Sequence, residues 1–188
     1  MADKIECTAL KPGMYFLDGN DLLKCISADR NKTAMRKMVV IVKCRNMRTG
    51  AVKEMTFSGD TIETAYIEKK TVSYYGYTDG EFFYFYDPEG NEYPVSAERL
   101  EDEKLYLVDG LELSLQIFNE NEILGVILPD KVEMELVECE EAVKGNTATS
   151  AEKNAVTETG LNVRVPMFIK NGERIIISTE TGKYSSRA

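Results

Sequence analysis

The chain has 188 residues, a hydrophobic fraction of 43% and a formal net charge of -9 at pH 7. This length suits one to three small domains, and dispersed charges with an ordinary apolar content predict folded segments. The chain has no histidine, and its four cysteines form no C-x-x-C pair. Ser-His-Asp and Cys-His catalysis are therefore excluded, and a zinc site is disfavoured.

No apolar run approaches the roughly 18 residues of a membrane span. The first residues, Met1 to Cys7, lack the apolar core of a signal peptide. We therefore expect a cytoplasmic protein without a membrane partner.

The charge is divided unevenly along the chain. Residues 1–65 carry 11 Lys or Arg against 8 Asp or Glu, a net charge of +3. Residues 66–129 carry 4 against 14, a net charge of -10, and residues 130–188 carry 8 against 10, a net charge of -2. The middle third should repel nucleic acid, whereas the first third should tolerate it.

A basic stretch runs from Asp29 to Arg48, with seven Lys or Arg against one acidic residue. Such an island in an acidic chain predicts that one end of the molecule approaches a polyanion. The alternative, which the charge pattern leaves open, is a solvated hairpin loop that happens to be basic.

The first third reads as short strands. Asp18-Gly19 is a two-residue hairpin signal, the basic loop follows the second strand, and Asn46 to Gly50 reads as a turn. The predicted strands are Met14–Leu17, Leu22–Ile26, Val39–Val42 and Val52–Phe57. Short strands so closely spaced predict a small β-barrel.

The middle third predicts a second all-β unit with one short helix over Ser96–Lys104. Its predicted strands are Val72–Tyr77, Phe82–Tyr86, Leu111–Phe118 and Glu122–Leu128. The aromatic cluster in the first two could be a base-stacking platform, but the acidic surroundings favour core packing and cross-strand pairing instead.

The last third opens with strict alternation in Val132–Leu136, and its loop Gly145–Ser150 has no core-forming side chain. Further strands are predicted in Val163–Ile169 and Arg174–Ile177, and Thr179–Tyr184 ends the chain in a hairpin. Two five-stranded barrels of the oligonucleotide-binding (OB) type fit the second and third units.

From Lys153 onward the spacing of residues becomes specific. The pattern is Lys153-x-Ala155-x4-Gly160-x2-Val163-x-Val165-Pro166-x2-Ile169-x2-Gly172. It resembles, at every defined position, the C-terminal signature of the bacterial elongation factor P family. Val143 to Ala148, Cys44 to Gly50, and the ending from Thr179 to Arg187 are also similar to stretches of that family. The likeness covers nearly the whole chain.

This resemblance implies an all-β fold of three small barrels. They would be an SH3-like (KOW-type) domain at 1–65, an acidic OB-fold domain at 66–129 and a second OB-fold domain at 130–188. It implies a monomeric tRNA mimic that binds both ribosomal subunits between the P and E sites. There it would position the peptidyl-tRNA of the P site, lie near the E-site codon of the mRNA, and promote peptide-bond formation at polyproline stalls. No enzyme activity, metal or cofactor is expected.

The resemblance also assigns a tip loop that would reach the acceptor end of the tRNA. The family's Pro-Gly-Lys-Gly turn, whose lysine or arginine is covalently extended, is replaced here. An ungapped alignment places Met35 at the tip, a slip of one residue places Arg36 there, and a slip of two places Lys37. Lys32 should add charge. Modification of Arg36 by a tip-modifying enzyme and an unmodified tip both remain open.

A second group of site residues follows from the resemblance in the last third. Gly145, Asn146 and Thr147, together with Tyr184 and Arg187, should face the small subunit, the mRNA and the tRNA. Asn146 replaces the family's aspartate, which keeps hydrogen bonding but removes a charge beside RNA.

Three other functions remain as alternatives. One is the elongation-factor-P-like paralogue with different stall motifs, and another is a single-stranded nucleic-acid-binding OB protein, which the acidic middle third disfavours. The third is an enzyme. Without histidine, a metal site or a phosphate loop it has little support, although a paired-carboxylate hydrolase stays open.

Overall fold

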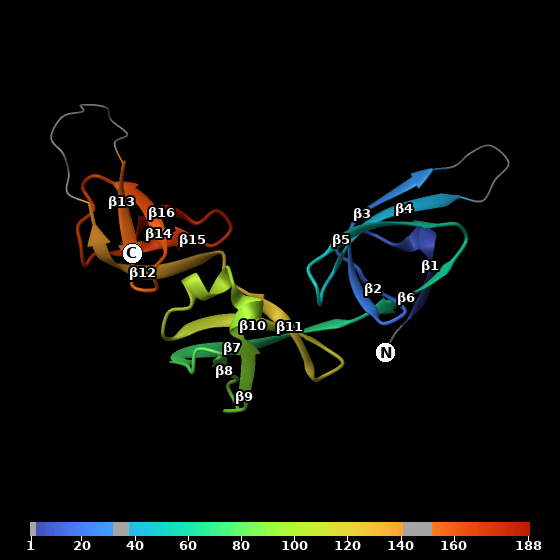
Figure 1. Cartoon of the computed structure of the whole chain (residues 1–188), viewed down its shortest axis with the longest axis horizontal. Coiled ribbons are helices and arrows are strands. Elements are labelled where there is room, and N and C mark those ends of the chain that lie inside the picture. The colour runs from blue at the N-terminus through green and yellow to red at the C-terminus, as the bar shows by residue number, and fades with distance from the viewer. Residues whose placement is uncertain (1–2, 32–37, 141–151) are drawn as a thin grey trace. The chain divides into compact units, whose positions relative to one another are not determined.

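The computed structural model describes residues 3–31, 38–140 and 152–188. Within these ranges the chain forms three antiparallel sheets and three short 3-10 helices, with no α-helix (Figure 1). The predicted all-β class is therefore confirmed. No helix in the described ranges has the length and apolar content to cross a membrane.

The chain divides into two compact units, Met1–Glu68 with Ile117–Leu124, and Lys69–Gln116 with Gly125–Ala188. The predicted domain limits 1–65, 66–129 and 130–188 stay predictions.

The first sheet forms a barrel-like fold in the order β1-β6-β2-β3-β4-β5. Asp18 and Asp21 face each other across the turn between β2 and β3, which confirms the predicted hairpin. The elements are β1 (Lys4–Glu6), the 3-10 helix η1 (Cys7–Ala9), β2 (Tyr15–Asp18), β3 (Asp21–Asn31), β4 (Val39–Asn46), β5 (Val52–Phe57) and β6 (Thr61–Ala65).

Alternation along β4 divides its side chains between the core and the surface of this fold. Val40, Val42 and Cys44 are fully buried, whereas Lys43 and Arg45 between and beyond them are exposed. Successive side chains of a strand point to opposite faces, so one face of β4 supplies the core and the other the surface. The core cluster consists of Cys7, Leu10, Phe16, Leu23, Cys25, Val40, Val42, Cys44 and Ile62.

A second, smaller apolar cluster in the same unit joins Leu22 to Phe118 and Leu124. The last two flank the turn between β10 (Leu111–Phe118) and β11 (Glu122–Ile127). The turn residues Asn119 and Glu120 have φ angles of 50° and 65°, the left-handed region that residues other than glycine adopt mainly in tight turns. Phe118 and Leu124 thus belong to the packing of the first unit.

The second sheet has the order β11-β10-β7-β8-β9, with β7 (Ile67–Thr78), β8 (Phe82–Tyr86) and β9 (Glu92–Ser96). Tyr74 packs against Phe83 and Phe85 with ring centroids 5.9 and 5.6 Å apart. This inward part of the aromatic cluster confirms the expected core and cross-strand role.

The helix predicted over Ser96–Lys104 was wrong. Two 3-10 helices stand there, η2 (Ala97–Leu100) and η3 (Glu103–Tyr106). The Ser96 hydroxyl accepts the backbone N–H of Glu98 at 3.3 Å, and Leu100 is fully buried. A continuous α-helix would place Glu98 above Asp102, and like charges four residues apart are destabilising.

A buried carboxylate anchors the turn after β8. The Asp87 side chain is only 1% exposed and lies 2.9 Å from the Lys70 ammonium. It also accepts hydrogen bonds from the side chain and backbone of Asn91, from the Tyr93 hydroxyl at 3.1 Å and from the Glu89 backbone. The Asn91 bonds, with help from Lys70 and Tyr93, hold the pKa of Asp87 well below its usual range.

The third sheet has the order β14-β13-β12-β15-β16. In both this sheet and the second, the first strand lies in the middle, between the second strand and the fourth. This shared order is expected of two related five-stranded barrels, as predicted. The strands of the third sheet are β12 (Lys131–Cys139), β13 (Glu152–Thr157), β14 (Asn162–Pro166), β15 (Arg174–Ser178) and β16 (Lys183–Arg187).

Candidate nucleic-acid interface

The basic stretch lies on the longest hairpin of the first barrel, formed by β3 and β4. Paired positions run from Leu23 opposite Asn46 to Asn31 opposite Val39. The strand predicted to end at Ile26 therefore continues to Asn31. The β-branched run of β4 supplies a continuous partner, and so the polar end of β3 stays in the ladder.

Four predicted tip residues, Lys32, Met35, Arg36 and Lys37, lie outside the described residues. Their expected contact with tRNA stays a prediction. The described ladder ends at Asn31 and Val39, so the segment that contains them begins and ends on paired strands. The hairpin is the scaffold on which any contact by these residues would depend.

Arg30, at the base of the tip, serves the fold. Its Nε donates to the Thr8 carbonyl at 2.9 Å, and its Nη2 donates to the Leu10 carbonyl at 2.8 Å. These bonds fix the segment around η1 against the hairpin. One of the seven cations counted in the basic stretch is therefore already hydrogen-bonded within the barrel.

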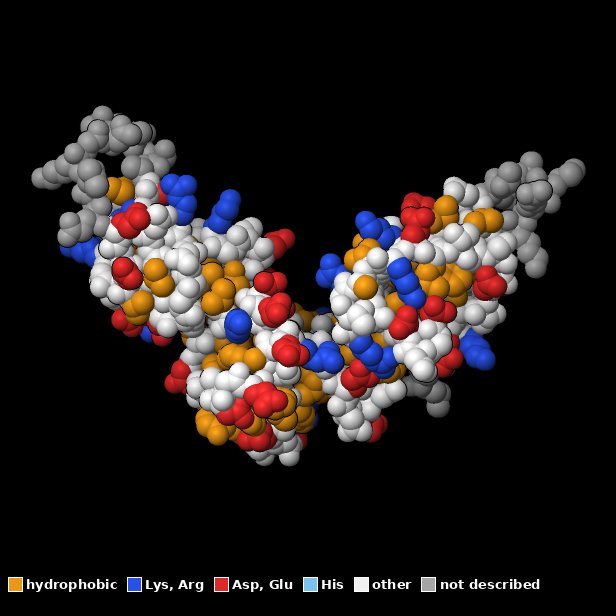
Figure 2. Space-filling view, viewed as in Figure 1, with side chains coloured by type: hydrophobic (Ala, Val, Ile, Leu, Met, Phe, Trp, Pro, Cys, Tyr) orange, Lys and Arg blue, Asp and Glu red, His pale blue; other side chains and the backbone are white. Residues whose placement is uncertain are grey.

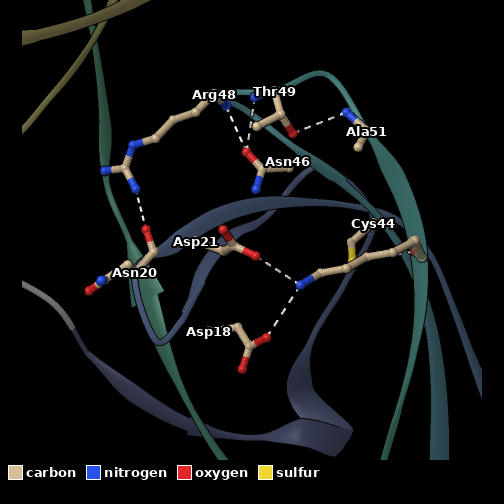
Figure 3. Close-up of polar contacts among 9 residues, drawn as sticks. Asp18, Asn20, Asp21, Cys44, Asn46, Arg48, Thr49 and Ala51 are labelled. Carbon is tan, nitrogen blue, oxygen red and sulfur yellow. Dashed lines mark hydrogen bonds and ion pairs between the residues drawn. The ribbon is translucent and has the colours of Figure 1, made fainter.

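Arg48, at the other end of the hairpin, is also hydrogen-bonded within the protein (Figure 3). Its Nε and Nη2 donate to the two carboxylate oxygens of Glu122 at 2.6 and 2.8 Å, and it also donates to the Asn20 carbonyl. The Asn46 side-chain oxygen accepts the backbone N–H groups of Arg48 and Thr49 at 2.8 and 3.1 Å. Asn46 thus forms the turn that was predicted at 46–50, and Arg48 ties that turn to Glu122.

Lys53 on β5 pairs with two carboxylates, those of Asp18 and Asp21, which Figure 3 labels. Its ammonium lies 3.0 Å from Asp21 and 3.4 Å from Asp18. The hydrogen bond to Lys53 lowers the pKa of Asp21, and the same bond raises the pKa of Lys53. All three side chains are more than a third exposed, so water screens this cluster and its effect on stability is small.

Three other cations form what we call the outer hairpin face: Lys24, Lys43 and Arg45. Lys24 stands opposite Arg45 in the ladder. Both residues have buried neighbours on either side in the sequence, so their own side chains lie on the outward face. Lys24 lies over the Tyr15 ring at 5.7 Å. Within the described ranges no ion pair involves Lys43 or Arg45, which are exposed. These side chains are available for phosphate oxygens.

Sequence reasoning did not single out the outer hairpin face as a site. It named only the tip and treated the seven cations as one group. The period-two alternation of β4 could have separated Lys43 and Arg45 from the core positions, but it could not have shown that Arg30 and Arg48 are used internally.

In the third barrel, Gly145, Asn146 and Thr147 lie outside the described residues. The strands on either side, β12 and β13, are paired from Leu136 opposite Thr157 to Cys139 opposite Ala155. Beyond them, the Glu140 carboxylate accepts the side-chain and backbone N–H groups of Asn154 at 2.9 and 3.1 Å. These bonds lower the pKa of Glu140 and tie the residue that follows β12 to β13.

The remaining two predicted residues lie on β16. Tyr184 packs against the apolar core of the third barrel. The Arg187 guanidinium lies 5.2 Å from the ring centroid of Phe168 and 2.9 Å from the Glu173 carboxylate. Phe168 is 61% exposed. Arg187 is thus a surface group held in place by two neighbours, whereas Tyr184 has a clear structural role.

The cysteines show no sign of metal-binding geometry. Cys7, Cys25 and Cys44 are buried free thiols, and Cys139 is partly buried. Burial raises the pKa of the Cys25, Cys44 and Cys139 thiols. In the described part of the chain no group of three or more Cys, Asp or Glu side chains could hold a metal ion.

Three family models match the sequence in succession. The model described as "Elongation factor P (EF-P) KOW-like domain" matches residues 6–62, and "Elongation factor P (EF-P) OB domain" matches residues 67–126. "Elongation factor P, C-terminal" matches residues 132–187. Together these matches cover most of the chain.

Named relatives agree with these models. Elongation factor P of Mycoplasma mycoides subsp. mycoides SC is 44% identical over 181 residues, which cover 95% of this chain and 97% of the relative. That of Malacoplasma penetrans is 41% identical over 188 residues, covering 100% and 99%. Among solved structures, eukaryotic translation initiation factor 5A from Methanococcus jannaschii matches with a TM-score of 0.54 and 15% identity, over 67% of this chain and 95% of that one. At this identity the structural likeness shows the fold alone.

Proposed function

Because the chain belongs to the elongation factor P family, we propose that it binds the ribosome between the P and E sites and positions peptidyl-tRNA. In this role it promotes peptide-bond formation at polyproline stalls. The family assignment supports the coarser part of this statement, a translation elongation factor that interacts with the ribosome. The binding position and the rescue of stalls are our proposal.

The observation that carries the proposal is the paired length of the β3–β4 hairpin. The ladder continues to Asn31 and Val39, and the segment between them contains Lys32, Arg36 and Lys37. The outer hairpin face adds three cations along the same arm. A rigid, basic arm on a compact barrel is suited to reach a phosphate backbone while the rest of the barrel stays clear of it.

No catalytic group of the protein is needed for this function. The ribosome makes the peptide bond, and a bound factor accelerates it by holding the tRNA in a productive orientation. Under this proposal, the aligning effect is strongest where consecutive prolines are joined. Met35 or Arg36 at the tip would lie nearest the acceptor end, and Arg36 is the proposed target of any tip-modifying enzyme.

The third barrel would provide the second attachment. Gly145, Asn146 and Thr147 have short or absent side chains, so they would contact RNA through the backbone and small polar groups. Arg187, exposed and oriented by Glu173 and Phe168, would add a phosphate contact. Two separate attachments raise the effective affinity without a single strong site.

A reconstituted translation system tests the proposal. Synthesis through a triple-proline reporter should become faster when the protein is added, while a reporter with the prolines replaced by alanine should not change. Equal rates with and without the protein on both reporters would contradict the proposal. Acceleration only at other stall sequences would favour the paralogous reading.

The same preparation separates the nucleic-acid-binding reading. Filter binding at near-physiological salt should show weak affinity for random single-stranded RNA, because only one third of the chain is basic. Sub-micromolar affinity for such RNA would favour a general single-strand-binding protein instead.

A further inference from the structure

Four tyrosines stand in adjoining pairs on the outward face of the second barrel, and we call them the tyrosine strip: Tyr75 and Tyr77 on β7, Tyr84 and Tyr86 on β8. The rings of Tyr77 and Tyr84 are 4.9 Å apart between centroids, and those of Tyr75 and Tyr86 are 6.0 Å apart. Tyr75 and Tyr77 are 61% and 55% exposed. The core needs none of these large rings, since Tyr74 and Phe85 fill the inner face.

The local backbone brings the two pairs together. The β7–β8 register shifts between Tyr74 and Thr78, and Gly76 within that shift has a φ angle of 74°. Such a bulge re-aims neighbouring side chains. Added side chains at Gly76 would be strained by this φ angle, so the arrangement of Tyr75 and Tyr77 depends on the glycine.

Carboxylates accept the hydroxyl groups at the ends of the strip. The Tyr84 hydroxyl donates to Asp79 at 2.7 Å, and the Tyr86 hydroxyl donates to Glu92 at 2.8 Å. Asp79 and Glu92 are themselves exposed. In Figure 2, apolar and acidic side chains gather together over the region of β8 and β9. The surface is therefore aromatic and negatively charged at the same place.

These hydrogen bonds also favour the protonated form of the two phenol groups. The bond to Asp79 raises the pKa of Tyr84 to about 12, and the bond to Glu92 raises the pKa of Tyr86. Both phenols consequently stay protonated and keep their carboxylates at the edge of the rings. A ring face is attractive to a cation, and a nearby carboxylate adds to that attraction.

We propose that the tyrosine strip is a docking surface for an arginine-rich polypeptide segment. A guanidinium is flat, stacks on aromatic faces and binds carboxylates in two bonds, so it matches both features of the strip. A lysine ammonium matches the charge but not the stacking. Single-stranded RNA could also stack on exposed rings, but its phosphates would meet Asp79, Glu92 and a segment whose net charge is -10. The inference goes beyond the function proposed above and does not depend on it.

The test is a titration of the full-length protein with three peptides of equal length, in which serine alternates with arginine, with lysine or with the neutral arginine analogue citrulline. Ring-labelled tyrosine NMR follows the strip directly. We expect signals of strip tyrosines to shift with the arginine peptide, several-fold weaker binding of the lysine peptide, and no binding of the citrulline peptide.

Two variants locate the site. Replacing both Tyr75 and Tyr77 with leucine should weaken arginine-peptide binding about tenfold, since two exposed cation–π contacts are lost. Glu92→Gln, which keeps an acceptor for Tyr86 but removes the charge, should weaken it about threefold and serves if the double variant folds poorly. Tyr66→Leu, at a tyrosine outside the strip that is 74% exposed, is the matched control and should bind normally.

Three results would overturn the proposal. They are equal binding of arginine and lysine peptides with no effect of the double leucine variant, unchanged binding by Glu92→Gln, and binding of a single-stranded oligonucleotide to the strip in preference to the arginine peptide. The last result would make the strip a base-stacking surface.

Discussion

The outer hairpin face and the tyrosine strip are built alike and differ in chemistry. Both consist of outward positions on neighbouring antiparallel strands of a small barrel, and both lie opposite buried residues such as Cys44 and Phe85. One face carries Lys24, Lys43 and Arg45, whereas the other carries four tyrosines edged by carboxylates. The inward positions specify a barrel in each case, so the outward positions are free to specify different partners.

In each region some charged side chains are bound within the fold and others are left at the surface. In the first unit, Arg30 and Arg48 are bound by carbonyl and carboxylate groups of the same unit, while Lys43 and Arg45 make no ion pair among the described residues. In the second barrel, Asp87 is buried and bound, whereas Glu92 is exposed at the strip. Charges already bound should matter for stability, and exposed charges should matter for binding.

The largest expected effect on stability comes from Asp87. Asp87→Asn removes the charge opposite Lys70 and turns a donor toward the Asn91 side-chain amide, which already donates there. We expect the midpoint of thermal unfolding of the second barrel to fall by roughly 10 °C. Asp21→Asn, at a carboxylate that is 46% exposed, is the control. Circular dichroism with barrel-specific NMR signals measures the unfolding midpoint of both variants. Equal small shifts in the two would contradict the distinction between bound and exposed charges.

The same carboxylate predicts a pH dependence. The folded pKa of Asp87 lies below its ordinary value of 3.8, so its stabilising effect is complete above that value and is lost as the pH falls through the folded pKa. The stability gap between wild type and Asp87→Asn should therefore narrow below about pH 4. Urea unfolding at pH 6, 4 and 3 tests this, and a gap that widens toward acid would be the wrong sign.

Removing the exposed cations of the outer hairpin face should weaken ribosome binding. Lys43→Ala combined with Arg45→Ala should reduce affinity about tenfold and lower the salt slope by roughly 2, because two phosphate contacts are lost. The double leucine variant of Tyr75 and Tyr77 should leave the salt slope unchanged. Co-sedimentation at several salt concentrations compares the two, and an unchanged slope in both would remove the distinction between these faces.

A bulky residue in the loop of the third barrel should have a moderate effect. Thr147→Trp is expected to slow rescue of the triple-proline reporter several-fold while the fold is kept, because a loop of short side chains implies close approach to RNA. Glu180→Trp, on an exposed turn of the same barrel, is the size-matched control. Full rescue by Thr147→Trp would mean that this loop does not approach RNA.

The smallest expected effect concerns the bound arginine Arg48. Its pair with Glu122 is about one-third exposed on both sides, so Arg48→Ala should destabilise the first unit by about 1 kcal/mol. Hydrogen exchange should become faster around Asn20 and the turn residues Asn119 and Glu120, because Arg48 also donates to the Asn20 carbonyl. If ribosome affinity fell as much as in the Lys43 and Arg45 variant, Arg48 would have to be counted with the surface cations.

The sequence predicted the strands wherever alternation or a β-branched run was strong. Val39–Val42, Val132–Leu136 and the hairpin around Gly19 are examples that the structure confirms. It missed β9 because Pro94 usually argues against a strand, yet Pro94 sits on an edge strand where no N–H is needed. It also missed the polar end of β3, whose pairing comes from β4.

The site was predictable to a smaller degree. Family resemblance named Arg36 and Arg187, but it gave no information on which cations the fold already binds. That Arg30 and Arg48 meet the Thr8 carbonyl and Glu122 follows from contacts across 22 and 74 residues of sequence, which no local pattern encodes. The tyrosine strip was hidden for a similar reason, since alternation alone did not show how the bulge at Gly76 aligns the rings.

The most direct measurement of the central claim is the rate of triple-proline synthesis in a reconstituted system with Arg36→Ala and Met35→Ala, compared with Lys170→Ala, an exposed cation of the third barrel. We predict that Arg36→Ala slows synthesis about tenfold or more, in line with the loss of one charge-assisted bond worth about 1.5–3 kcal/mol, while Met35→Ala matters less and Lys170→Ala matters least. Thermal stability should be nearly unchanged in all three. Normal rescue by Arg36→Ala together with a strong loss in Met35→Ala would contradict the account and leave a tip that works by apolar contact.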